Sequence, residues 1–121
     1  MSEKTAIFSK KERVGTITLN RPKAMNAINT ELLGDLQEVC NQIALDKEIR
    51  VIVLEGSGGN FCSGADMSWL NDPPEVSEWM EILKSFHKTI RTIREFPQPV
   101  ITKLRGVAVG GGADLYQRFR N

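Results

Sequence analysis

Two glycine-rich segments offer main-chain groups for chemistry. The first covers residues 56–64 and the second covers residues 106–112. Glycine lets a ligand approach the backbone and permits the positive φ that tight turns need. One N–H from the turn at 64–66 and one from a helix start at 110–112 could point at the same acyl oxygen. Two such donors form an oxyanion hole, and loss of one costs about 3 kcal/mol of transition-state stabilisation. On spacing alone, two tight turns without a function remain the simpler explanation.

Three better-known motifs fail at the residue that carries their chemistry. A dinucleotide fingerprint over residues 56–61 would end in glycine, but Phe61 stands there. A phosphate loop over residues 59–64 would be followed by lysine, but Ala65 follows. A nucleophile elbow around Ser63 would need glycine at residues 61 and 65, where Phe61 and Ala65 stand. Backbone donors are the chemistry that remains.

The expected strands place both glycine segments at one edge of a sheet. Residues 14–19 alternate apolar and polar types, which indicates a half-buried strand, and residues 6–8 are its hairpin partner. Residues 51–54 form a continuous apolar run, typical of a parallel strand covered on both faces, and residues 100–104 form another strand. In such sheets ligands bind beyond the carboxyl ends of the strands. Each glycine segment follows one of these ends.

Two amphipathic helices connect these strands. The first begins at Asn29 or Thr30, either of which can cap it, and its apolar positions share one face: Leu32, Leu36, Val39, Cys40 and Ile43. The second covers residues 76–96, before Pro97, and its stripe contains Trp79, Ile82, Leu83, Phe86, Ile90 and Ile93. A closing helix should follow residue 112. The order β-β-α-β-α-β-α predicts an α/β fold with a largely parallel sheet.

Composition narrows the possible partners. The 121 residues allow one domain, and 16 Lys and Arg against 15 Asp and Glu give a net charge of +1. That balance predicts no nucleic-acid or membrane partner, and no apolar run reaches the roughly 20 residues that span a bilayer. The two cysteines, Cys40 and Cys62, form no CxxC pair and His87 is the only histidine, so no metal site is expected. We expect a cytoplasmic protein with reduced thiols.

Three segments resemble signatures of the crotonase family, the enoyl-CoA hydratase/isomerase superfamily. They are the loop at residues 20–27 (NRPKAMNA), residues 61–67 (FCSGADM) and residues 106–115 (GVAVGGGADL), and they occur in the family's order. The resemblance implies a truncated crotonase (ClpP/crotonase-like) core of ββα repeats with a largely parallel sheet. A serine peptidase on the related ClpP-like fold is a weaker alternative, because no catalytic Ser–His pair is visible.

The resemblance also implies a site for an acyl-CoA thioester, with no cofactor beyond the coenzyme A of the substrate. The backbone amides of Ala65 and Gly111 would hold the thioester oxygen while an enolate forms. Asp114 would be a general acid or base, although a carboxylate in the first turn of a helix is also a common surface feature. The positions matched to CoA binding are Lys23, Ala24, Ser63, Ala65, Asp66, Met67 and Gly110.

Neighbouring residues have expected roles of their own. Arg21 and Lys23 would bring positive charge to the phosphates of the ligand. Asp66 would hold its loop by hydrogen bonds. Trp69 and Trp79 are candidates for the wall of an acyl pocket, although core packing is the more frequent use of such residues.

The tail departs from the family pattern. Residues 116–121 contain two arginines and two large aromatics where the family has small apolar residues. We therefore expect residues 1–121 to form a single incomplete crotonase-like domain, family-like to about residue 115, with weak or no turnover. Full-length relatives would form trimers or hexamers, an assembly doubtful for this fragment. The alternative function is a non-catalytic fragment that binds acyl-CoA or complements a partner. Asp114 favours hydratase or isomerase over hydrolase chemistry, and the acyl chain is left open.

Overall fold

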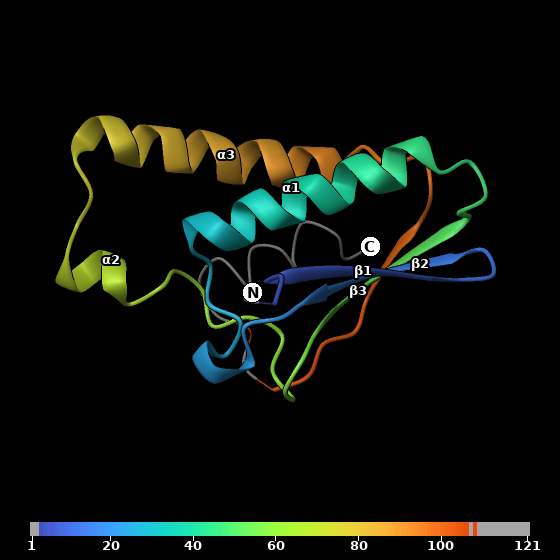
Figure 1. Ribbon diagram of the computed structural model, residues 1–121, viewed down its shortest axis with the longest axis horizontal. Coiled ribbons are helices and arrows are strands. Elements are labelled where there is room, and N and C mark those ends of the chain that lie inside the picture. Colours follow the sequence, from blue (N-terminus) through green and yellow to red (C-terminus); the bar gives the residue numbers. More distant parts are fainter. Residues whose placement is uncertain (1–2, 107, 109–121) are drawn as a thin grey trace.

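The computed structural model describes residues 3–106 and residue 108, and it contains a four-stranded sheet in the order β1-β2-β3-β4. The hairpin of β1 (Ala6–Lys11) and β2 (Val14–Leu19) is antiparallel. Strand β3 (Val51–Gly56) runs parallel to β2, and β4 (Val100–Thr102) runs parallel to β3. This arrangement, drawn in Figure 1, confirms the predicted α/β fold with a largely parallel sheet.

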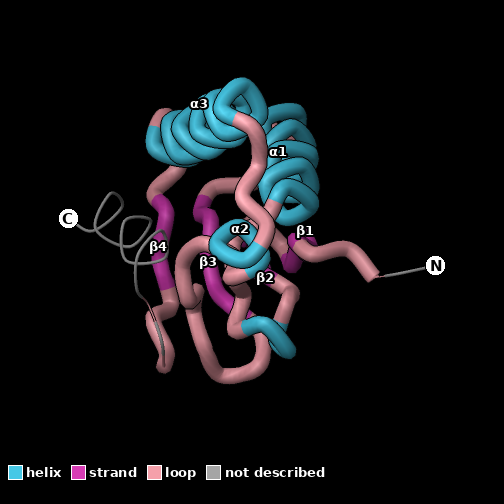
Figure 2. Tube along the Cα trace, turned by 90° about the vertical axis from the view of Figure 1, so that its left-hand side faces the viewer, coloured by secondary structure: helices cyan, strands magenta, loops and turns pink. Residues whose placement is uncertain are grey.

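Two long helices, α1 (Thr30–Leu45) and α3 (Val76–Arg94), cover one face of the sheet (Figure 2). Because side chains alternate along a strand, one set of positions in β2 and β3 faces these helices. Those side chains are almost completely buried, and they are Ile17, Leu19, Ile52 and Leu54. The helices fill the other half of the core with Leu32, Leu36, Cys40 and Ile43 from α1 and with Ile82, Ile90 and Ile93 from α3. The apolar stripes thus have the predicted positions, except that Leu83 lies at the margin and is 49% exposed.

The opposite face of the sheet is more open in the described part of the chain. Val51 and Val53 are half-buried, and Ile101, the partner of Val53 in β4, is 54% exposed. The expectation that β3 is covered on both faces was therefore wrong for residues 3–106 and 108. The reason is that α1 and α3 lie on the same side of the sheet.

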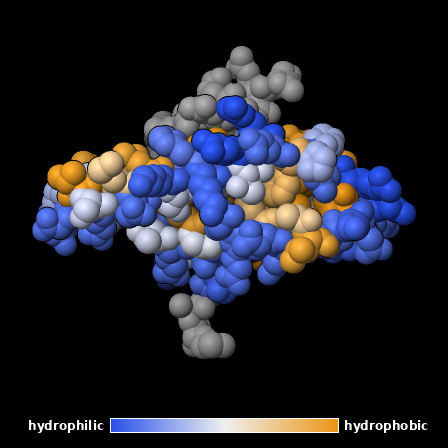
Figure 3. Space-filling model, turned by 90° about the horizontal axis from the view of Figure 1, so that it is seen from above, coloured by the Kyte–Doolittle hydropathy of each residue, from blue (hydrophilic) through white to orange (hydrophobic). Residues whose placement is uncertain are grey.

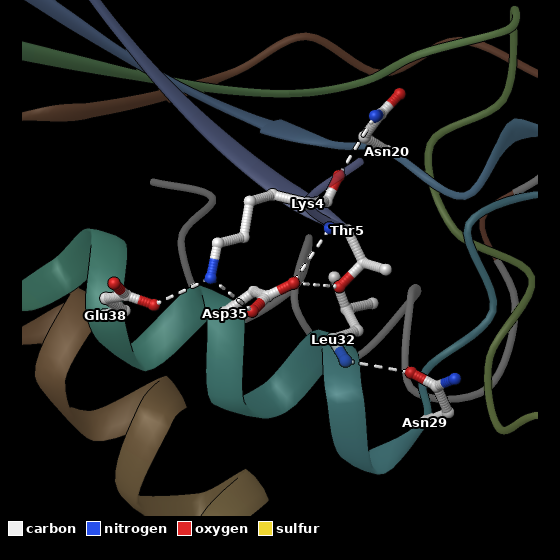
Figure 4. A network of polar contacts seen from close by, with 7 residues as sticks. All are labelled: Lys4, Thr5, Asn20, Asn29, Leu32, Asp35 and Glu38. Carbon is white, nitrogen blue, oxygen red and sulfur yellow. Dashed lines mark hydrogen bonds and ion pairs between the residues drawn. The ribbon is translucent and has the colours of Figure 1, made fainter. Parts of the chain in front are cut away.

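Polar contacts fasten the start of α1 to the start of β1 (Figure 4). Asn29 is the N-cap, and its Oδ1 accepts a hydrogen bond from the Leu32 N–H at 2.8 Å. One turn later, Asp35 accepts from both the N–H and the hydroxyl of Thr5, at 2.8 and 2.7 Å. Partial burial raises the pKa of Asp35, but the bonds from Thr5 and the charge of Lys4 outweigh it and hold that pKa below its usual value.

Two short elements had no signal in the sequence. They are the 3-10 helix η1 (Pro22–Ala24) and the helix α2 (Ser68–Asn71), each too short to show a period. The closing helix expected after residue 112 lies outside the described residues. None of the helices within the described ranges combines the length and the apolar character that crossing a membrane requires.

Candidate functional site

Three loops meet at the carboxyl ends of β2, β3 and β4. We call residues 20–29, residues 57–67, and residues 103–106 with residue 108 the loop cluster, which gathers in the lower part of Figure 1. Isolated bridges join Ile28 to Ala65 and Cys62 to Ala108, and the Phe61 N–H donates to the Arg105 carbonyl at 2.8 Å. The edge of the sheet predicted to carry the ligand site is therefore a set of connected loops.

Asn26 is the polar centre of the loop cluster. It is completely buried and has a positive φ of 56°, a conformation that asparagine tolerates better than most residues. Its Oδ1 accepts from the Arg21 N–H at 2.7 Å, and its Nδ2 donates to the carbonyls of Ser57 and Asn60, both at 2.9 Å. One side chain thus joins the loop after β2 to the loop after β3. Sequence reasoning gave Asn26 no role, because the two carbonyls that accept from its amide lie more than 30 residues away.

The last residue of β3 has to be glycine for Asn26 to fit. A Cβ on Gly56 would collide with the carbonyl oxygens of Asn60 and Phe61 and would lie 2.7 Å from the Asn26 Nδ2. The first glycine of the segment therefore has a packing role. It lets the main chain turn around the buried amide.

The bridge between Ile28 and Ala65 fixes the direction of one backbone donor. The Ile28 N–H donates to the Gly64 carbonyl at 2.7 Å, and the Asp66 N–H donates to the Ile28 carbonyl at 2.9 Å. Because successive residues of an extended segment direct their N–H groups to opposite sides, the N–H of Ala65 points away from Ile28. Ala65 is exposed, and no acceptor in residues 3–106 or 108 pairs with its amide. Among the described residues, this geometry leaves a fixed donor without an acceptor.

An ion pair holds the two sides of the site together. The Arg21 Nη1 lies 2.9 Å from the Asp66 Oδ2 and also donates to the Ala27 carbonyl. Hydrogen bonds from Ser68, followed by Arg21, hold the pKa of Asp66 below its usual range. Asp66 therefore fastens its loop, as expected. The charge of Arg21 is neutralised inside the protein, so the expectation that Arg21 serves the phosphates of a ligand is not supported. Lys23 is exposed.

The other predicted site residues fall into two groups. Lys23 and Ala24 lie on η1, and Ser63 joins them through its N–H, which donates to Met25 at 3.0 Å, and its hydroxyl, which donates to Ala24 at 3.3 Å. Met67 lies at the same edge and is 66% exposed. The structure thus brings six of the predicted positions into one loop cluster: Lys23, Ala24, Ser63, Ala65, Asp66 and Met67. Gly110, Gly111 and Asp114 lie outside the described residues.

An apolar cavity opens beside Ala65. We call it the tryptophan pocket, and its volume is about 160 Å³. It is lined by Ile28, Leu33, Ala65, Trp69, Trp79, Ile82, Leu83 and Phe86. The rings of Trp69 and Trp79 are 5.3 Å apart at an interplanar angle of 63°, an edge-to-face pair. Apolar side chains also gather on the surface over the start of α3, at the left of Figure 3, and include Val76 and Met80.

The described side chains around the site, in residues 3–106 and 108, do not form a nucleophile. Burial raises the pKa of the Cys62 thiol, which a hydrogen bond from Gly64 only partly opposes. Burial raises the pKa of Cys40 to about 12. Both cysteines are therefore thiols at neutral pH, and His87 is exposed on α3, away from Ser63 in the loop cluster. Within the described part of the chain, no group of three His, Cys, Asp or Glu residues could hold a metal ion.

Comparisons with known proteins show which family the chain resembles. The family model "Enoyl-CoA hydratase/isomerase" matches residues 9–117. The chain is 38% identical over 105 residues to the 1,2-epoxyphenylacetyl-CoA isomerase of Escherichia coli (strain K12), a match that covers 84% of this chain and 40% of the relative. It is 37% identical over 108 residues to the probable enoyl-CoA hydratase echA12 of Mycobacterium leprae (strain TN), covering 84% of this chain and 37% of the relative.

A solved structure extends the likeness to the fold. The crystal structure of an enoyl-CoA hydratase from Mycobacterium smegmatis superimposes with a TM-score of 0.90 at 31% identity, over 97% of this chain and 46% of that one. The chain thus spans less than half the length of these relatives. The resemblance found in the sequence is confirmed. The chain belongs to the enoyl-CoA hydratase/isomerase family.

Proposed function

We propose that the loop cluster binds an acyl-CoA thioester for hydratase or isomerase chemistry. The observation that carries the proposal is the N–H of exposed Ala65, which the bridge to Ile28 directs away from Ile28 and which has no acceptor in residues 3–106 or 108, beside an apolar pocket. A donor fixed before the reaction is suited to an oxygen that gains negative charge, because the donor needs no reorganisation as the charge develops. The thioester carbonyl oxygen is the group that meets this description.

In this proposal each residue has a separate task. The N–H of Ala65 donates to the thioester oxygen, and the N–H of Gly111 supplies the second donor by family resemblance. Asp114, also by resemblance, moves a proton beside the thioester as the enolate forms and collapses. The coenzyme A moiety lies along η1 and the adjoining loop, where we assign Lys23, Ala24, Ser63, Asp66, Met67 and Gly110 to its binding. Exposed Lys23 offers a charge for a phosphate.

Nuclear magnetic resonance of the whole 121-residue chain tests this assignment. Coenzyme A and acetyl-CoA should both shift the amide signals of Lys23 and Ala24, because both ligands carry the nucleotide. Acetyl-CoA should shift the Ala65 signal further than coenzyme A does, because only a thioester brings a carbonyl oxygen to that amide. An unchanged Ala65 signal in a chain saturated with acetyl-CoA would contradict the proposal.

A second measurement separates an enzyme from a binding fragment. Loss of the enoyl-thioester absorbance of crotonyl-CoA, followed over time, reports hydration. Turnover above the rate without protein supports hydratase chemistry. Acetyl-CoA binding without turnover would instead favour the non-catalytic alternative.

A further inference from the structure

We propose that the tryptophan pocket selects the acyl group, and that it takes an apolar group with about the bulk of a six-membered ring. This inference rests on the proposed function, because it assumes that a thioester oxygen binds the Ala65 amide. It adds the substrate class and the residues that set it, Trp69 and Trp79.

Position is the first argument. Ala65 carries the amide that points away from Ile28 and also lines the pocket, so an acyl chain attached to the bound carbonyl begins at the edge of the cavity. Ile28 also lines this edge. Its backbone hydrogen bonds to Gly64 and Asp66 fix the position of residues 64–66 relative to residue 28. The entrance is therefore a fixed part of the loop cluster.

The chemistry of the lining is the second argument. Every side chain that lines the pocket is aliphatic or aromatic, and none carries a charge or a hydroxyl group. A polar acyl substituent would lose its hydrogen bonds to water there without replacement. A hydrocarbon group would exchange water for apolar contact.

Size is the third argument. Pockets that enclose a whole ligand usually measure roughly 300–1,000 Å³. The tryptophan pocket, at about 160 Å³, fits only part of a ligand. An apolar protein cavity of about 150 Å³ binds benzene. The space therefore matches a ring, or a chain of about six carbons.

The two tryptophans limit the pocket. Trp69 comes from α2 and Trp79 from α3, and their edge-to-face contact at 5.3 Å joins the two helices. The backbone N–H of Trp69 also donates to the Asp66 carbonyl at 3.1 Å, so this wall is connected to the loop that presents Ala65. The pair is thus placed to limit how far an acyl group enters.

Tryptophan fluorescence gives a direct test, because the chain has two tryptophans and both line this pocket. The chain is titrated with coenzyme A, acetyl-CoA, hexanoyl-CoA, phenylacetyl-CoA and dodecanoyl-CoA. We expect hexanoyl-CoA and phenylacetyl-CoA to change the emission and to bind at least about tenfold more tightly than acetyl-CoA, since each buried methylene strengthens binding. Dodecanoyl-CoA should bind less than threefold more tightly than hexanoyl-CoA.

A filled pocket sharpens the test. Leu83→Trp adds a large side chain at a half-exposed lining position, so the fold can accept it. Calorimetry should show less than threefold preference for hexanoyl-CoA over acetyl-CoA. Leu70→Trp is the matched control, because Leu70 is 73% exposed and does not line the pocket. That variant should keep the tenfold preference.

The outcomes separate the two proposals. If acetyl-CoA binds and shifts the Ala65 amide while hexanoyl-CoA and phenylacetyl-CoA bind no more tightly, the pocket assignment is wrong and the proposed function stands. A further tenfold gain for dodecanoyl-CoA overturns the size limit. If neither coenzyme A nor any acyl-CoA binds, the proposed function itself fails.

Discussion

The helix-covered face of the sheet and the loop cluster share one apolar core, which includes Phe61 and Cys62 of the loop cluster, but they differ in their polar contacts. Between the sheet and its two helices, apolar side chains such as Ile17 and Ile52 are completely buried. In the loop cluster, the three hydrogen bonds of Asn26 and the ion pair of Arg21 with Asp66 connect segments far apart in the chain. Apolar contacts are numerous and non-directional, whereas these polar contacts are few and directional. We therefore expect stability to reside in the first region and precise geometry in the second.

The largest effect should come from a cavity in the core. Ile52→Ala removes a fully buried side chain between the sheet and the helices, and should lower the free energy of unfolding by about 2–5 kcal/mol. Urea denaturation measures this change. Val53→Ala is the matched control on the open face, where the half-buried side chain should contribute less than half as much. Equal losses at both positions would mean that the two faces are covered alike.

Removing the buried amide should break the loop cluster with less effect on the core. Asn26→Ala removes the hydrogen bonds that the buried Nδ2 donates to the carbonyls of Ser57 and Asn60, which should cost about 1–3 kcal/mol. Hydrogen exchange should become faster in residues 57–61, while the amides of α1 lose little protection. The affinity for acetyl-CoA should fall at least about tenfold, because the loop that presents Ala65 loses its anchor.

An exposed asparagine provides the comparison for that variant. Asn41→Ala on α1 should leave both the exchange of residues 57–61 and acetyl-CoA binding unchanged. If Asn26→Ala behaved in the same way, the hydrogen bonds of Asn26 would not be what holds the loops.

Acid should weaken both regions through one carboxylate each. The pKa values of Asp35 and Asp66 are lowered in the folded chain from an ordinary value of 3.8. A lowered folded-state pKa adds stability above the unfolded-state value, and that stability is lost as the pH falls through the folded-state value. The free energy of unfolding should therefore decline below about pH 4.

Substitution separates the two contributions to this acid response. Asp35→Asn should cost about 1 kcal/mol at pH 7 and make the decline shallower, and Asp66→Asn should do the same while also loosening residues 62–68. Denaturation at pH 7 and pH 3 measures both. Asp72→Asn, at an exposed position, is the control. An unaltered acid response in Asp35→Asn would contradict the role of the bonds from Thr5.

The smallest effect should come from a surface charge. Lys4 lies 3.4 Å from Glu38 and 3.7 Å from Asp35, with its side chain 65% exposed. Water and salt screen such pairs, so Lys4→Gln should leave the free energy of unfolding nearly unchanged. Thermal denaturation at low and high salt checks this. A loss as large as that of Asn26→Ala would show that these surface ion pairs stabilise α1 as strongly as buried contacts do.

The parts of the fold with a regular period were predictable. The strand at residues 14–19 has its predicted bounds, and the two long helices begin where a cap and a periodic stripe indicated. Strand β1 is longer than predicted, because the hairpin pairing continues to Lys11. Strand β4 is shorter and ends at Thr102. Alternation and helical periodicity are local signals, so one sequence suffices to detect them.

The details of the site were less predictable because they depend on distant partners. The loops were located by the glycine segments and by the family resemblance. The buried role of Asn26 and the ion pair that neutralises Arg21 depend on residues 31 to 45 positions away. The tryptophan pocket needs the four-residue helix α2, which has no periodic pattern. Such features follow from the packing of the whole fold.

The bridge between Ile28 and Ala65 has a consequence for how this site tolerates mutation. The proposed donor is an atom that nineteen of the twenty standard amino acids possess, so exchanging Ala65 for serine would leave it in place. The direction of this N–H is set by the paired backbone of Ile28 and by Gly64, whose φ of 97° few other residues adopt. A mutational scan should therefore find residue 64 far less forgiving than residue 65. The residue type is therefore more constrained at Gly64 than at Ala65, the residue that carries the donor.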